Sequence, residues 1–82
     1  MITITAVEEV KTGKVIEHKR SLKLFRSIDK CMKYIAPFVR EMKLAESQKR
    51  KPSKYIDGVS YDTDYEKRML IGAGAIRSEE VI

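Results

Sequence analysis

Hydrophobic and polar residues alternate through the first 25 positions with the two-residue period of β-strands. The alternation is interrupted at residues 11–14, where Gly13 has the conformational freedom that a tight hairpin turn requires. We therefore predict a β-hairpin over residues 1–25, with a second strand from about Val15 to Leu24. One face of the first strand carries Ile2, Ile4, Ala6 and Val10.

The second predicted strand is charged in its middle, where His18, Lys19 and Arg20 stand together. Charged side chains are favoured on strands at the edge of a sheet, because they discourage pairing with other chains. We expect this strand to lie at a sheet edge.

The period changes to three and four residues at Ser27, which is a suitable helix N-cap with Asp29 following in the first turn. We predict a helix over residues 27–48 that packs on the hairpin. Pro37 lies inside this pattern, and because the apolar stripe continues past it in phase, we expect a kink and not an end. The stripe comprises Ile28, Cys31, Ile35, Phe38, Met42 and Ala45, widened by Met32 and Val39.

A basic connector over residues 49–54 precedes the C-terminal part, where we predict a pair of strands over residues 55–76. The first is interrupted by Asp57-Gly58, a dipeptide that fits either a turn or a β-bulge. The second runs from about Lys67 to Ala75. A short helix is the alternative here, because Thr63 and Glu66 have the spacing of a capping box, but Gly72 and Gly74 argue against a long one.

These elements predict a small α+β protein of one domain, residues 1–82, in the order β-β-α-β-β. Its antiparallel sheet has one face covered by the helix, and residues 77–82 form a loose tail. The uncovered face and the sheet edges are the expected interaction surface.

Charge is unevenly distributed along the chain. Residues 1–54 hold 14 Lys and Arg against six Asp and Glu, whereas residues 55–82 hold three against six. A basic majority followed by an acidic tail indicates a partner that is acidic at least locally. The residues expected to contact it are Lys14, Lys19, Arg20, Lys23, Arg26, Lys49, Arg50, Lys51 and Lys54.

The composition indicates the cellular compartment in which the protein works. A single cysteine, Cys31, excludes an internal disulfide and suits a reducing compartment. Apolar runs are too short to span a bilayer, and the N-terminal residues lack the pattern of a signal peptide. We expect a cytoplasmic protein with no membrane partner.

Motifs for catalysis, metals or cofactors are incomplete. Residues 62–66 begin like a calcium loop, but Lys67 and Ala73 stand where it needs glycine and glutamate. Residues 72–77 lack the third glycine of a dinucleotide-binding fingerprint. Cys31 lies on the apolar stripe, which indicates a structural thiol, and His18 alone completes no triad or metal site. We predict no enzyme activity, no cofactor and no metal.

The function predicted from the sequence is a non-catalytic binding protein that acts by occupying the surface of a partner. In size and character it resembles in type the small inhibitors that phages and mobile elements direct at host nucleic-acid-handling proteins, although no motif carries this analogy. The alternative is direct, largely sequence-independent nucleic-acid binding, with the four tyrosines as stacking planes. A homodimer is also possible, since a second copy can cover a bare edge and sheet face.

Overall fold

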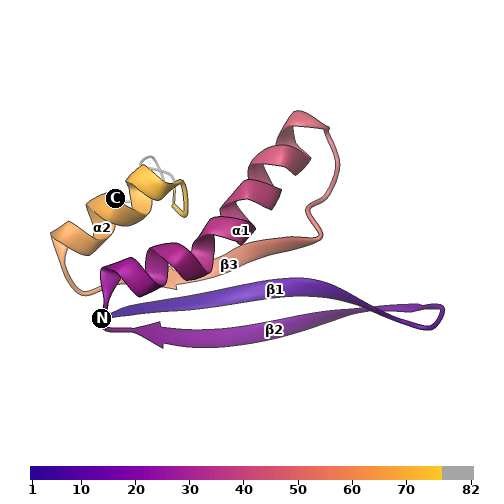
Figure 1. Cartoon of the computed structure of the whole chain (residues 1–82), viewed down its shortest axis with the longest axis horizontal. Helices are drawn as coiled ribbons and strands as arrows, with labels where there is room; N and C mark the ends of the chain where they lie inside the picture. The colour runs from indigo at the N-terminus through magenta and orange to yellow at the C-terminus, as the bar shows by residue number, and fades with distance from the viewer. Residues whose placement is uncertain (77–82) are drawn as a thin grey trace.

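The computed structural model describes residues 1–76 and contains a three-stranded antiparallel sheet with two helices (Figure 1). The strands lie in the order β2-β1-β3, so β1 is central. Both helices lie on the same side of the β1–β2 hairpin. The predicted α+β class is confirmed. The elements are β1 (Ile2–Thr12), β2 (Val15–Phe25), α1 (Ile28–Ser47), β3 (Lys54–Ser60) and α2 (Asp64–Ala73).

The predicted hairpin and its turn are confirmed. Thr12 and Val15 are opposite one another across a two-residue turn, and Gly13 adopts the positive φ of 64° that such turns favour. β2 lies at the edge of the sheet, as its charged centre predicted. The distal part of the hairpin projects beyond α1 as an arm, and every residue from 8 to 20 is exposed.

The Asp57-Gly58 dipeptide forms a β-bulge, one of the two predicted possibilities. Thr5 is opposite Gly58 and Ala6 is opposite Ile56, so Asp57 is an extra residue without a partner on β1. The bulge places the Asp57 side chain where it reaches across the sheet to β2.

The helix α1 begins where the sequence predicted, because the Ser27 hydroxyl accepts a hydrogen bond from the Lys30 N–H at 3.4 Å. It continues through Pro37 to Ser47, whereas a kink at this residue stays a prediction. Cys31 is fully buried, as its place on the apolar stripe predicted, and burial raises the pKa of its thiol.

The hydrophobic core lies between the helix-facing side of the sheet and the two helices. The fully buried centre of this core is small. Half-buried side chains from β2, β3 and both helices surround it. The fully or nearly fully buried cluster consists of Ile2, Ile4, Cys31, Ile35, Val39 and Leu70.

The predicted final strand at residues 67–75 is wrong, because this segment forms α2, so the order is β-β-α-β-α. The capping box identified as the alternative is complete: the Thr63 hydroxyl accepts from the Glu66 N–H, and the Glu66 carboxylate accepts from the Thr63 N–H. Gly74 closes the helix in the left-handed conformation, so it acts as a stop signal outside the helix. The burial of Leu70 outweighs the cost of Gly72 within the helix.

The loose tail predicted for residues 77–82 lies outside the described residues. Within residues 1–76, neither helix combines the length and the apolar character that a bilayer crossing demands.

Candidate interaction surface

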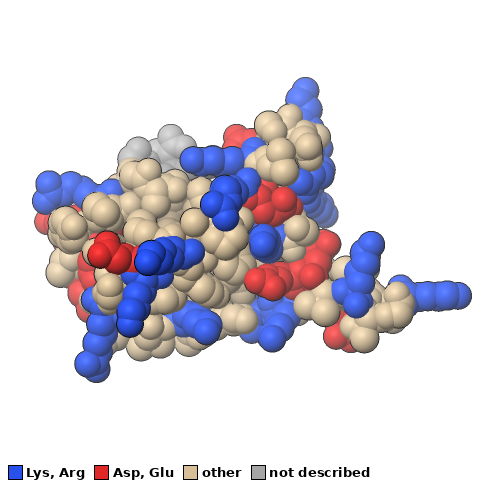
Figure 2. All heavy atoms as spheres, viewed as in Figure 1, with Lys and Arg blue, Asp and Glu red and all other residues tan. Residues whose placement is uncertain are grey.

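The nine basic residues predicted to bind a partner do not share one side of the molecule. Alternation along the strands places Lys19, Lys23 and Lys54 on the helix-facing side of the sheet, whereas Arg20 is on the open side. Lys14 is at the tip of the hairpin. Figure 2 shows cationic side chains at both ends of the molecule and across the face between them, interspersed with acidic ones. The remaining four, Arg26, Lys49, Arg50 and Lys51, lie in the segments that precede and follow α1.

Two of these cations are already paired within the chain. The Arg20 guanidinium donates to the Asp57 carboxylate, and the pair crosses the central strand from β2 to β3. Val7 is opposite Arg20 on β1 and is only 3% exposed, although it faces the open side. The Arg20–Asp57 pair therefore covers part of the open face instead of offering a free charge.

The second pair joins the connector to α1. The Arg50 guanidinium donates to both oxygens of Glu41, at 2.8 and 3.2 Å, and the same carboxylate accepts from the Ser53 N–H at 2.6 Å and its hydroxyl at 3.0 Å. The Glu41 side chain is 13% exposed. These contacts fix the chain between the end of α1 and the start of β3, so Arg50 has a structural role.

The contacts of Glu41 predict an acid-dependent loss of stability. Hydrogen bonds from Arg50, followed by those from Ser53, lower the pKa of Glu41 from 4.5 to about 2. The folded state thus favours the ionised carboxylate; the resulting stabilisation is complete above about pH 5 and is lost as the pH falls towards 2. In urea titrations between pH 7 and 2.5, E41Q should be less stable than the wild type at pH 7, and the difference should shrink in acid. A constant difference would contradict this.

The exposed Glu46 on the same helix provides the matched control for that experiment. E46Q removes the same charge from α1 without disturbing the connector, and its stability at pH 7 should stay close to that of the wild type. Equal effects of the two changes would mean that net charge, and not the Arg50 and Ser53 contacts, is responsible.

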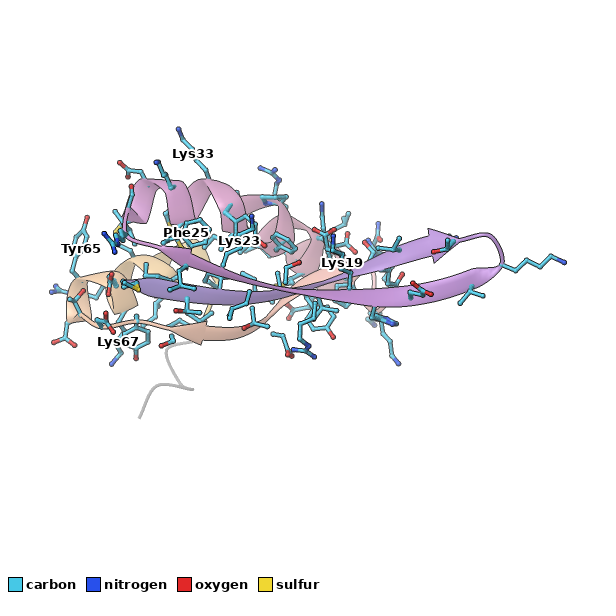
Figure 3. All side chains as sticks on the ribbon, turned by 90° about the horizontal axis from the view of Figure 1, so that it is seen from below. Lys19, Lys23, Phe25, Lys33, Tyr65 and Lys67 are labelled. Carbon is cyan, nitrogen blue, oxygen red and sulfur yellow. The ribbon has the colours of Figure 1, made fainter. Side chains whose placement is uncertain are left out.

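Two further lysines lie over aromatic rings. The Lys23 ammonium is 5.8 Å from the centre of the Tyr34 ring, and that of Lys54 is 5.9 Å from the centre of Phe38. Phe25, Tyr34 and Phe38 form a row with ring centres 5.2 and 5.3 Å apart. Lys23 and Phe25 project from β2 on the side of α1 (Figure 3). The row is built into the seam between sheet and helix, so it is not a free stacking platform.

Most of the tyrosines proposed as stacking planes for nucleic-acid bases are partly covered by other residues of the chain. Tyr34, Tyr55 and Tyr61 are half-buried, while Tyr65 on α2 is 57% exposed. A single exposed ring does not form the series of platforms that single-stranded nucleic acid requires.

The connector folds back beside β1 of the hairpin. The Glu9 N–H donates to the Ser53 carbonyl at 2.8 Å, which extends the contact between β1 and the segment before β3. A shallow hollow on this side is lined by Glu9, His18, Lys51, Pro52 and Tyr55. His18 Nε2 lies 3.8 Å from a carboxylate oxygen of Glu9. Because Glu9 and Lys51 both line it, this hollow is of mixed charge.

The open face of the sheet carries the exposed apolar side chains that the nine-residue prediction missed. Leu22 and Leu24 of β2 are 64% and 62% exposed. Thr3 and Thr5 of the central strand are opposite Leu24 and Leu22, and Gly58 follows on β3. No helix among residues 1–76 packs on this face. The alternation of the two leucines with Lys23 was a sequence signal for them.

The acidic residues near the start of α2 act as caps. The Glu66 carboxylate accepts from the N–H groups of Asp62 and Thr63 and from the Met1 amino group at 2.7 Å, and these contacts, the amino group first, lower its pKa to about 2. Across residues 1–76, no three His, Cys, Asp or Glu side chains converge as metal ligands would.

Comparisons with protein-family models, with curated proteins and with solved structures give no match to this chain.

Proposed function

We propose that the protein is a non-catalytic binding module that acts by occupying the surface of a partner protein through the open face of its sheet. The observation that carries this proposal is the exposure of Leu22 and Leu24 beside the small and uncharged residues of β1 and β3. Large apolar side chains that are more than half exposed on a sheet face are removed from water when a partner covers them, and this burial favours binding.

The charges around this face favour a protein partner over a polynucleotide. Arg20 is bound to Asp57, and the Glu9 carboxylate lies beside His18, so the border of the apolar patch has no excess of positive charge. The remaining cations point in several directions, so few of them can follow one phosphate backbone at the same time. The partner that fits this face therefore presents apolar side chains.

Capture experiments with the double variant L22T/L24T test this function. Threonine keeps the preference for a strand but removes most of the apolar contact area, so the variant should fold and should lose at least roughly tenfold in affinity for its protein partner. Tagged wild-type and variant chains are compared in pull-downs from the native host lysate after nuclease treatment, followed by titration with the captured protein.

The matched control is L44Q, which changes an exposed leucine on α1, away from the sheet face. It should capture the partner as the wild type does. Retention of random DNA at physiological salt by the wild type, with a steep loss at higher salt and no effect of L22T/L24T, would instead support direct nucleic-acid binding.

A further inference from the structure

Among residues 1–76, no strand pairs with the outer edge of β2, which is 11 residues long, whereas β3 on the other side of the sheet has seven residues. Figure 1 shows β2 along the lower border of the molecule, with β1 between it and the rest of the fold. Backbone groups on such an edge are available to another strand, and the charged centre of β2 restricts pairing to a strand whose charges are complementary.

The register identifies the backbone groups that point outward. Thr12 and Val15 flank a two-residue turn and therefore exchange both of their backbone hydrogen bonds. The N–H of Glu9 points to the other neighbour, since it donates to Ser53. Following this alternation, the odd-numbered residues of β2 bond to β1. The groups that face outward belong to Ile16, His18, Arg20, Leu22 and Leu24.

We propose that the occupant of this edge is a second copy of the chain, paired antiparallel through β2 about a two-fold axis at Arg20. The two sheets then form one sheet of six strands. In this register Glu17, the acidic residue of β2, is opposite Lys23 of the second copy, and this ion pair occurs twice. Apolar residues are also opposite one another: Val15 is opposite Phe25 and Ile16 is opposite Leu24.

Neighbouring registers lack this complementarity. An axis at Lys19 brings two copies of that lysine together and sets Val15 against Lys23. An axis at Ser21 sets Lys19 against Lys23 twice. Like charges directly opposite one another destabilise a strand pair, so charge disfavours both of these axes. An axis at His18 would also form an ion pair, between Glu17 and Lys19, but it sets Ile16 against Arg20 and leaves Leu24 without a partner on β2 of the second copy.

The axis itself brings two Arg20 residues together, and the fold reduces the cost of this contact. Each guanidinium is bound to Asp57 of its own chain, which compensates its charge. Pairing in turn covers Ile16 and Leu24, which are 53% and 62% exposed in the single chain. It also places the Leu22 and Leu24 pairs of both copies on one continuous open face.

The dimer goes beyond the proposed function and does not depend on it, since it is measured on the purified protein without a binding partner. Sedimentation equilibrium over a concentration series should show a monomer–dimer equilibrium. E17K and K23E should each raise the dimer dissociation constant about tenfold or more, because two ion pairs become two like-charge contacts. The double variant E17K/K23E should restore dimerisation to within about threefold of the wild type.

The control K33E makes the same charge change as K23E on α1, where Lys33 points away from the sheet (Figure 3), and should leave the dissociation constant near that of the wild type. A monomer at every concentration, or a double variant that dimerises less well than either single one, overturns the proposal.

Proline substitution tests the backbone contacts separately. H18P removes an N–H that points outward, so the chain should keep its fold, as seen by circular dichroism, and lose dimerisation. K19P removes an N–H that bonds to β1 and should instead destabilise the fold. A folded H18P variant that dimerises like the wild type overturns pairing through this edge.

Discussion

Replacement of Leu70 by alanine is expected to lower the free energy of unfolding by about 3 kcal/mol, a large fraction of the stability of a protein of this size. Leu70 is the fully buried residue of α2 and packs in the core cluster with residues of β1 and α1. Truncation removes apolar contacts from both layers and leaves a cavity that the surrounding elements fill only in part. Urea denaturation at a fixed protein concentration measures the change.

The variant R68A serves as the control and distinguishes α2 from the strand that the sequence predicted for residues 67–75. Arg68 is exposed, and its replacement should change the stability by no more than about 0.5 kcal/mol. In a strand, positions 68 and 70 would share one face, whereas in α2 they point in different directions. Similar losses for L70A and R68A would therefore contradict the helix.

Long periodic segments were predictable from the sequence, and the short C-terminal helix was not. The hairpin and α1 each contain repeated signals, and Gly13 and Ser27 mark their boundaries. In α2, the low helix propensity of two glycines argued against a helix. The helix is stabilised by the packing of Leu70 on core residues that are distant in the sequence. The Thr63–Glu66 capping box was the correct local signal.

The candidate surface was predictable in outline and not in its residues. The sequence predicted nine basic residues as contacts for a partner. Two of them, Arg20 and Arg50, bind acidic side chains of the same chain, and these ion pairs can be identified only from the structure. Arg20 meets Asp57 because β1 separates β2 from β3 by a single strand, although the two residues are 37 positions apart. Arg50 meets Glu41 because the connector turns back on α1. Intramolecular pairing leaves Leu22 and Leu24 as the more distinctive surface feature.

The exposed arm connects the fold to the proposed interactions. The turn end of the hairpin extends past α1, and its residues are all exposed, because β3 pairs with β1 only as far as Glu8. A two-stranded ribbon of this kind is marginally stable on its own in water. Pairing of β2 with a second copy would give the arm a third strand along its outer edge, so dimerisation and ordering of the arm are expected to be coupled.

Replacement of Gly72 and of Gly74 by alanine is expected to change the free energy of unfolding in opposite directions. The two variants should differ in this free energy by about 2 kcal/mol. Gly72 lies within α2, where a methyl group would meet no atom within 4 Å, so G72A should stabilise by up to about 1 kcal/mol. Gly74 has a φ of 84°, and a methyl group there would lie 3.4 Å from side-chain carbons of Val39 and Lys43.

G74A should therefore destabilise by about 1–2 kcal/mol, because alanine in the left-handed conformation is strained and the neighbouring side chains of α1 must move. Each glycine serves as the control for the other, since the chemical change is identical and the positions are two residues apart. In a strand both would lie on one face and lose the same backbone freedom, so they would respond alike. Thermal and urea unfolding of the two variants thus tests the end of α2 directly, and changes of the same sign would show that the helix does not end at Gly74.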